Sequence, residues 1–241
     1  MRHMMIWGMG ALITMLGQSG LQADDLKSTD KVSAAMVMSS PVLVSLKMVP
    51  RGAAVLTSSG LLNEQGMAHI IHAAPGAMSP PKNSANPKLF EPTLESIGAS
   101  VANSLALAKS AQIKKVAIPL LGGGIWLERI GKTPEQLAQA IATAAVAHRG
   151  EVEVVLVGYS DADYHAFQKA VKPGTAGVSV VQGDITKPNV HGAAAIVNAA
   201  NMEVVFGGGL SHAIGEASGK KDEINAEARL AMEQFWHAQK P

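Results

Sequence analysis

Val116-Ala-Ile-Pro-Leu-Leu-Gly122-Gly123-Gly124-Ile125-Trp126 is a buried-strand pattern that runs into three consecutive glycines. A second unit of this kind follows later, where Ala195-Ile-Val-Asn198-Ala-Ala-Asn201 precedes Phe206-Gly207-Gly208-Gly209-Leu210. Glycine accepts positive φ angles and lets a phosphate approach backbone N–H groups without a Cβ in the way, and a helix that begins there adds a favourable dipole. A single glycine triplet after a strand is more often a tight turn. Two of them together predict a cradle for a pyrophosphate.

The composition excludes several classes of protein. Among 241 residues, 20 Lys and Arg stand against 19 Asp and Glu, so the basic excess needed to bind a nucleic-acid backbone is missing. The chain has no cysteine, which excludes disulfides, thiolate metal sites and cysteine nucleophiles. Its length suffices for one substantial core, and no long charged or repetitive stretch indicates general disorder. We expect one main globular domain and no nucleic-acid partner.

The N-terminal segment has the pattern of a secretory signal peptide. A short positive region at Arg2 and His3 precedes an apolar stretch from Met4 to Leu16, and Ala23 offers a small residue for cleavage. The apolar stretch is too short to span a bilayer comfortably. We therefore expect residues 1–23 to direct export to the periplasm or the exterior, with residues 24–46 as a linker. The alternative is an ordered N-terminal helix packed on the domain of a cytoplasmic protein.

Strand and helix patterns alternate along the rest of the chain. The long segment from Pro75 to Pro92 is rich in Pro, Asn and Ser and reads as an irregular loop. The alternation predicts a three-layer α/β/α domain with a mixed central sheet. The expected strands cover residues 42–46, 53–57, 69–74, 115–120, 151–157, 178–182 and 193–199, and the expected helices cover residues 93–110, 133–148, 161–171, 210–217 and 222–236.

Three polar residues stand at the ends of predicted strands. Asp184 either forms an Asx turn or accepts a hydrogen bond from an exocyclic amine such as that of adenine, while the Ile185 N–H donates to a ring nitrogen. Asn198 and Asn201 bracket two alanines at the end of a buried strand, where an unpaired amide is costly. Their partners are either backbone groups or the hydroxyls of a ligand.

Other phosphate and metal patterns fit the sequence poorly. Gly131-Lys132-Thr133 lacks the upstream glycine of a P-loop, because Trp126 occupies that position. Neither glycine triplet has the spacing of a dinucleotide-binding fingerprint. His69 and His72 lie three residues apart on a strand pattern and so point to opposite faces. We expect these histidines to pack and to form hydrogen bonds, and we expect no metal site.

Four motifs resemble, in order and spacing, the first half of a macro domain. The motifs are Gln182-Gly-Asp184-Ile-Thr-Lys, Ala195 to Asn201, Gly207-Gly-Gly-Leu-Ser-His-Ala-Ile and Ala217-Ser-Gly219. The second half is similar to His69-Ile-Ile-His72-Ala, to the helix around Ser104-Leu-Ala-Leu-Ala108, to Ile118 to Trp126, and to Val154 to Phe167, but these stand first in this chain. The sequence thus resembles a circularly permuted macro domain over residues 47–241. Residues 172–177 join the two usual termini, which often lie close together in a domain.

The resemblance implies ADP-ribose as the ligand, with no cofactor required, in a cleft at the strand ends. It implies that Asp184 and Ile185 read adenine and that Tyr159 packs against it. It also implies that Asn201 hydrogen-bonds the distal ribose, with Asn198 supporting the loop. Two loops then face each other across the diphosphate and distal ribose: Gly207, Gly208, Gly209 and Leu210 on one side, and Gly122, Gly123, Gly124, Ile125 and Trp126 on the other, with Trp126 covering the sugar.

Binding of free ADP-ribose or of ADP-ribosylated targets is the function that this resemblance implies. The first alternative is a hydrolase that removes mono-ADP-ribose from proteins or deacylates O-acyl-ADP-ribose, with Asn201 as the catalytic candidate. Against it, Phe206 stands where viral hydrolases carry a histidine, and Ser211 stands where one hydrolase branch carries an aspartate. The second alternative is a general nucleotide- or NAD-binding α/β protein.

Overall fold

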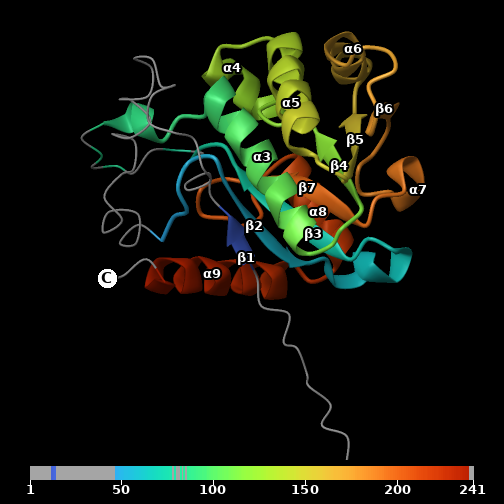
Figure 1. Ribbon diagram of the computed structural model, residues 1–241. Helices are drawn as coiled ribbons and strands as arrows, with labels where there is room; N and C mark the ends of the chain where they lie inside the picture. The colour runs from blue at the N-terminus through green and yellow to red at the C-terminus, as the bar shows by residue number, and fades with distance from the viewer. Residues whose placement is uncertain are drawn as a thin grey trace, which may run out of the picture.

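A single sheet of seven strands organises the computed structural model, which describes residues 12–14, 47–77, 79, 82, 84 and 86–238. The strand order is β1-β2-β3-β7-β4-β5-β6 (Figure 1). The strands β3, β7, β4, β5 and β6 are parallel, whereas β2 is antiparallel to β3 and β1 is antiparallel to β2. Their bounds are β1 Leu12–Thr14, β2 Ala53–Ser58, β3 His69–Ala74, β4 Lys115–Pro119, β5 Glu153–Gly158, β6 Val178–Gln182 and β7 Ala195–Ala199. The mixed sheet expected from the sequence is confirmed.

The helices agree with the periodic patterns of the sequence. Every helix predicted between residues 93 and 236 is present, with ends that differ by at most a few residues. The helical elements that were not predicted have three to six residues each, too few to show periodicity. The helices are α3 Leu94–Ser110, α4 Leu127–Ile130, α5 Pro134–His148, α6 Asp161–Ala170, α7 Pro188–His191, α8 Leu210–Ser218 and α9 Lys221–Ala238, and the 3-10 turns are η1 Gly60–Gln65, η2 Pro87–Leu89 and η3 Gly124–Trp126.

The predicted signal peptide and linker lie outside the described residues, except for β1. This strand pairs with the edge of the sheet, with Leu12 opposite Leu56 and Thr14 opposite Ala54. The strand expected at residues 42–46 also lies outside the described residues. Export therefore stays a prediction. Within the part of the chain that the structure describes, no helix is long and apolar enough to cross a membrane.

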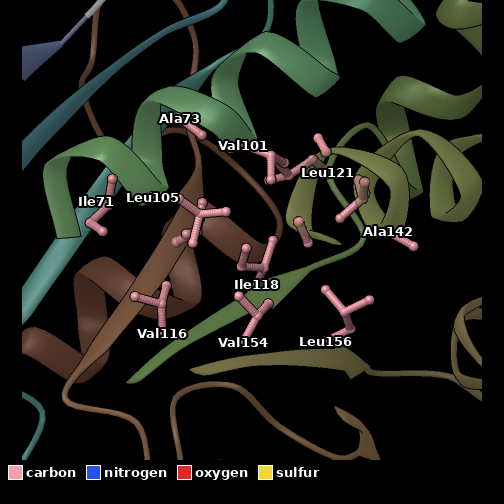
Figure 2. Close-up of a cluster of buried hydrophobic side chains, with 14 of the residues drawn as sticks. Ile71, Ala73, Val101, Leu105, Val116, Ile118, Leu121, Ala142, Val154 and Leu156 are labelled. Atoms are coloured by element: carbon pink, nitrogen blue, oxygen red, sulfur yellow. The ribbon is translucent and has the colours of Figure 1, made fainter. Parts of the chain in front are cut away.

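One face of the sheet is covered by α3, α5 and α6. Figure 2 shows Val101 and Leu105 of α3 above Ile118 of β4, whereas Leu156 of β5 lies on the side of Ala142 of α5. Successive strand residues point to opposite faces, so Ile118 faces α3 while its neighbour Ala117 belongs to the core on the other side. Because both faces are covered, the parallel strands are apolar throughout.

The other face is covered by η1, α8 and α9. Ile214 of α8 and Ile224 of α9 are buried with Ile196 of β7. The far end of α9 is held by Trp236, whose Nε1–H donates to the carbonyl oxygen of Met48 at 3.1 Å. Helices on both faces of a mixed sheet make the three-layer α/β/α arrangement that the sequence predicted.

Gly158 and Gly98 make a matched pair for testing this packing. A Cβ at Gly158, the last residue of β5, overlaps the backbone of Tyr164, whereas a Cβ at Gly98 in α3 comes only within 3.9 Å of the Ala144 side chain. We expect Gly158→Ala to lower the free energy of unfolding by about 1–3 kcal/mol through overpacking. We expect Gly98→Ala to raise it by about 0.5–1 kcal/mol, because alanine loses less entropy in a helix. Urea unfolding measures both, and equal effects contradict the prediction.

Candidate functional site

The carboxyl ends of five parallel strands meet at one edge of the sheet, and the residues predicted for the site follow these ends. Gly122 to Trp126 follow β4, Tyr159 follows β5, and Asp184 follows β6. Asn201 and the glycines at 207–209 follow β7. In open α/β sheets, ligands bind at this edge, where connections leave in different directions. The tertiary structure thus gathers these residues at one end of the sheet, whereas Asn198 lies within β7.

The order of the strands sets the spacing of these groups. β7 and β4 are neighbours, so the bases of the two glycine-containing loops lie roughly 5 Å apart. β6 lies three strands away from β7, which places Asp184 roughly 14 Å from the base of the β7 loop. The arrangement suits an elongated ligand, with an anionic part beside β7 and β4 and another part reaching β6.

Gly207, Gly208 and Gly209, here called the glycine loop, are exposed and open. A Cβ added at any of the three meets nothing within 4 Å. Gly209 has a φ of 58°, which a residue with a side chain adopts only with strain. Neighbouring protein atoms would leave room for side chains at these positions. Glycine is needed here because it leaves the backbone N–H groups accessible to a ligand and because Gly209 has a positive φ.

The start of α8 differs from those of α3, α5 and α6. Those three helices are closed by capping boxes built on Thr93, Thr133 and Ser160. The N-cap of α8 is Gly209, which has no side chain to cap with. Because the first N–H groups of a helix have no partner inside it, this end of α8 can donate to an anion held by the glycine loop.

The loop after β4 has a buried half and an open half. Gly122 has a φ of 84°, and a Cβ there meets the side chains of Ile97 and Ile130, so this glycine serves packing. A Cβ at Gly124 meets nothing within 4 Å, and the side chain of Trp126 is half-buried. Gly123 is half-buried between them, and the side chain of Ile125 is outside what the structure describes. The open half of this loop is Gly124 and Trp126.

Asp184 forms the Asx turn that the sequence left open. Its Oδ1 accepts hydrogen bonds from the Thr186 N–H at 2.9 Å and from the Thr186 hydroxyl at 2.8 Å. Ile185 is 3% exposed, and its carbonyl oxygen lies 3.0 Å from Nε2 of the buried His191. Tyr159 on the neighbouring strand end is 74% exposed. The turn fixes the orientation of the Asp184 carboxylate through Oδ1. A role in ligand binding is compatible with this turn, because Oδ2 takes no part in it.

Asn198 lies inside the protein and not on the binding edge. It is 0% exposed, and its Nδ2 lies 3.2 Å from Nδ1 of His72 on β3. Nε2 of His72 lies 3.0 Å from the Thr57 hydroxyl. Burial lowers the pKa of His72 to about 3, so the ring is neutral. The Asn198 amide donates to Nδ1, and the ring proton therefore sits on Nε2, which donates to Thr57. Both His72 and Asn198 act in packing and hydrogen bonding here.

The segment between Asn201 and Phe206 links β7 to the glycine loop. Oδ1 of Asn201 accepts the Glu203 N–H at 3.0 Å, and its carbonyl oxygen accepts the Val204 N–H at 3.1 Å. Val204 has a φ of 51°, an uncommon conformation for a β-branched residue. Phe206 is buried, with its ring 5.2 Å from the ring of His72. The phenyl ring is therefore a core anchor below the loop.

The structure also contains a surface groove that the sequence did not indicate. Its volume is about 720 Å³, and it lies between α3 and α5. Small and apolar residues such as Gly98 and Ala144 line it together with polar ones, among them Gln139 and His148, and Glu95 and Glu135 lie at the N-terminal turns of the two helices. None of the residues predicted to bind ADP-ribose lines this groove.

Comparison with known families identifies part of the chain. The family model of the macro domain matches residues 40–142, a range that includes β2, β3, α3, β4 and the first part of α5. The resemblance to a macro domain is thereby confirmed for these residues, which belong to an α/β fold, whereas the permuted order of the motifs at residues 182–219 stays a prediction. Macro domains bind ADP-ribose. The search of curated proteins gives no match.

The burial of His72 makes stability depend on pH. In the unfolded chain the imidazole takes up a proton below its ordinary pKa of about 6.5, whereas the folded ring stays neutral down to about pH 3. The contribution of His72 to the free energy of unfolding is therefore highest above pH 6.5 and falls as the pH is lowered toward 3. From pH 7 to pH 5, His72 accounts for a loss of about 2 kcal/mol.

Urea unfolding of the wild type and of His72→Gln at pH 7 and pH 5 measures this share. We expect the variant to lose about 2 kcal/mol less on acidification than the wild type. Burial also lowers the pKa of His191, but this residue is present in both proteins and cancels in the comparison. The same pH dependence in both proteins contradicts a neutral buried His72.

Proposed function

We propose that the protein binds ADP-ribose, free or attached to a target protein, at the carboxyl edge of the parallel strands. The observation that carries the proposal is the open glycine loop that leads into the uncapped N-terminus of α8. Backbone N–H groups and a helix dipole in this geometry favour a diphosphate. The loop after β4 lies on the neighbouring strand, and Gly124 and Trp126 supply the second wall.

The adenine end of the ligand is proposed to lie at Asp184. The Asx turn holds one carboxylate oxygen, so the exocyclic amine of adenine is read by Oδ2, which accepts its hydrogen bond. Exposed Tyr159 lies on the adjacent strand end and offers a ring for stacking. The separation of roughly 14 Å between β6 and β7 matches two ligand ends joined by ribose and diphosphate groups.

We also propose that the macro domain extends over residues 47–241 in circularly permuted order. The family model matches residues 40–142 and leaves out the motifs at residues 182–219. A match in chain order is expected to stop in this way when the two halves of a domain have exchanged places. Further support comes from β6 and β7, which belong to the same sheet as the matched strands. Residues 172–177 are the connection between α6 and β6, where the usual termini were joined.

Calorimetric titration tests the proposed ligand. We expect ADP-ribose to bind with a dissociation constant in roughly the micromolar range, about −8 kcal/mol, and AMP, NAD and ribose 5-phosphate to bind more weakly, because each lacks or alters part of the ligand. A preference for NAD favours the general nucleotide-binding alternative. Incubation with a mono-ADP-ribosylated protein and with an O-acyl-ADP-ribose ester separates a binding module from the hydrolase alternative. No binding of any of these ligands contradicts the proposal.

Two substitutions test the two ends of the proposed site. A valine at Gly208 meets no protein atom within 4 Å of its Cβ, so Gly208→Val folds but fills the space of the diphosphate. We expect it to abolish ADP-ribose binding, with Gly208→Ala weaker in effect. Asp184→Ala removes the adenine contact and lowers affinity by roughly tenfold, as expected for a hydrogen bond to a charged group. Calorimetry gives the affinities and thermal unfolding controls for folding. Folded variants with wild-type affinity rule out this site.

A further inference from the structure

We infer that Ser211 and Asn225 are positioning residues that hold the glycine loop ready for a diphosphate, an inference that rests on the proposed function. The N–H of Gly207 donates to the hydroxyl oxygen of Ser211 at 3.1 Å. The N–H of the preceding Phe206 donates to Oδ1 of Asn225 at 2.9 Å. Two successive backbone amides at the entrance of the loop are thus fixed by side chains.

The two acceptors come from different helices. Ser211 lies in the first turn of α8 and is 4% exposed. Asn225 lies in α9, which is also hydrogen-bonded to the end of β2 and to the segment before β2. Both carboxylate oxygens of Glu227 accept the Ser58 N–H at 3.1 and 3.0 Å, and Trp236 donates to the Met48 carbonyl oxygen. The entrance of the glycine loop is therefore hydrogen-bonded to two helices that pack on the sheet.

A glycine loop needs such support more than any other loop. Glycine loses more conformational freedom on ordering than any other residue, and these three glycines have no side chains with which to pack. Without an anchor, the loop must become ordered when the ligand arrives, and that ordering weakens binding. The bonds to Ser211 and Asn225 restrict the loop beforehand, while the helix fixes its other end.

The same two bonds define which amides can meet the ligand. Because the N–H groups of Phe206 and Gly207 are taken by side chains, the groups that face a diphosphate are those from Gly208 onward, at the uncapped start of α8. Phe206 anchors the entrance of the loop to the core, because its buried ring packs against His72 and lies close to Gly215. The loop is held at its entrance and open at its tip.

Calorimetry with ADP-ribose on full-length variants tests the inference. We expect Ser211→Ala and Asn225→Ala each to raise the dissociation constant roughly threefold to tenfold, the usual range for loss of one hydrogen bond. Ser211→Thr and Asn225→Asp keep an acceptor oxygen, and we expect them to recover most of the affinity. Hydrogen exchange of residues 206–209 should become faster in the two alanine variants and not elsewhere in the chain.

Ser218→Ala is the matched control. Ser218 is a buried serine at the opposite end of α8, and its hydroxyl oxygen accepts the Lys220 N–H at 3.3 Å. We expect this variant to lose thermal stability as Ser211→Ala does but to keep wild-type affinity. If Ser211→Ala does not fold because Ser211 is buried, the affinities of Asn225→Ala and Asn225→Asp test the inference, since Asn225 is only half-buried.

The outcomes separate the inference from the proposed function. If the wild type binds ADP-ribose and both alanine variants bind as tightly as Ser218→Ala does, Ser211 and Asn225 are not positioning residues, while the proposed function stands. If the wild type does not bind ADP-ribose, the proposed function fails and the inference fails with it. Weakened binding in the alanine variants, recovery in Ser211→Thr and an unaffected control support the inference.

Discussion

The parallel pairing of β7 with both β3 and β4 is the interaction on which the rest of the structure depends. β7 lies between these strands, so without it the sheet separates into β1-β2-β3 on one side and β4-β5-β6 on the other. Ile196 and Val197 are both 0% exposed and face opposite sides, which ties the cores on the two faces together. A strand from late in the chain thus completes a sheet whose other central strands come from the first two thirds. The continuous edge at which we propose the ligand to bind exists only because this strand is in place.

The buried polar row of Thr57, His72 and Asn198 connects this central pairing with the site. Buried polar groups are tolerated when they are hydrogen-bonded, and the neutral state of His72 lets its two ring nitrogens act as one donor and one acceptor. Asn198 is the last polar residue before the chain leaves β7, and Phe206 returns to lie against His72. The segment that leads from β7 to the glycine loop therefore begins and ends on the same part of the core. This explains how an exposed and glycine-rich segment can have a defined start.

Much of the fold could be predicted from the sequence, because strands and helices have different periods and the helix starts are marked. Thr133 followed by Pro134 marks the start of α5, which the structure places at that residue. The short elements η1, α4 and α7 were missed, since four to six residues are too few to show a period. In the candidate site, the open glycines and Asp184 were identified, but the Asx turn and the adenine role could not be separated. The burial of Asn198 could not be predicted, because its hydrogen-bond partner His72 is 126 residues away in the chain.

The sequence by itself determined the class of fold, the two strand-to-glycine units and the resemblance to a macro domain, because these depend on local patterns of apolar residues and on the properties of glycine. The tertiary structure alone decided which of these groups come together. It placed Asp184 three strands from β7, buried Asn198 and Phe206 below the loop, and brought Asn225 of α9 to the amide of Phe206. The physical reason is that hydrogen bonds and packing between distant segments leave no local pattern in the sequence, since each partner is also an ordinary residue of its own helix or strand.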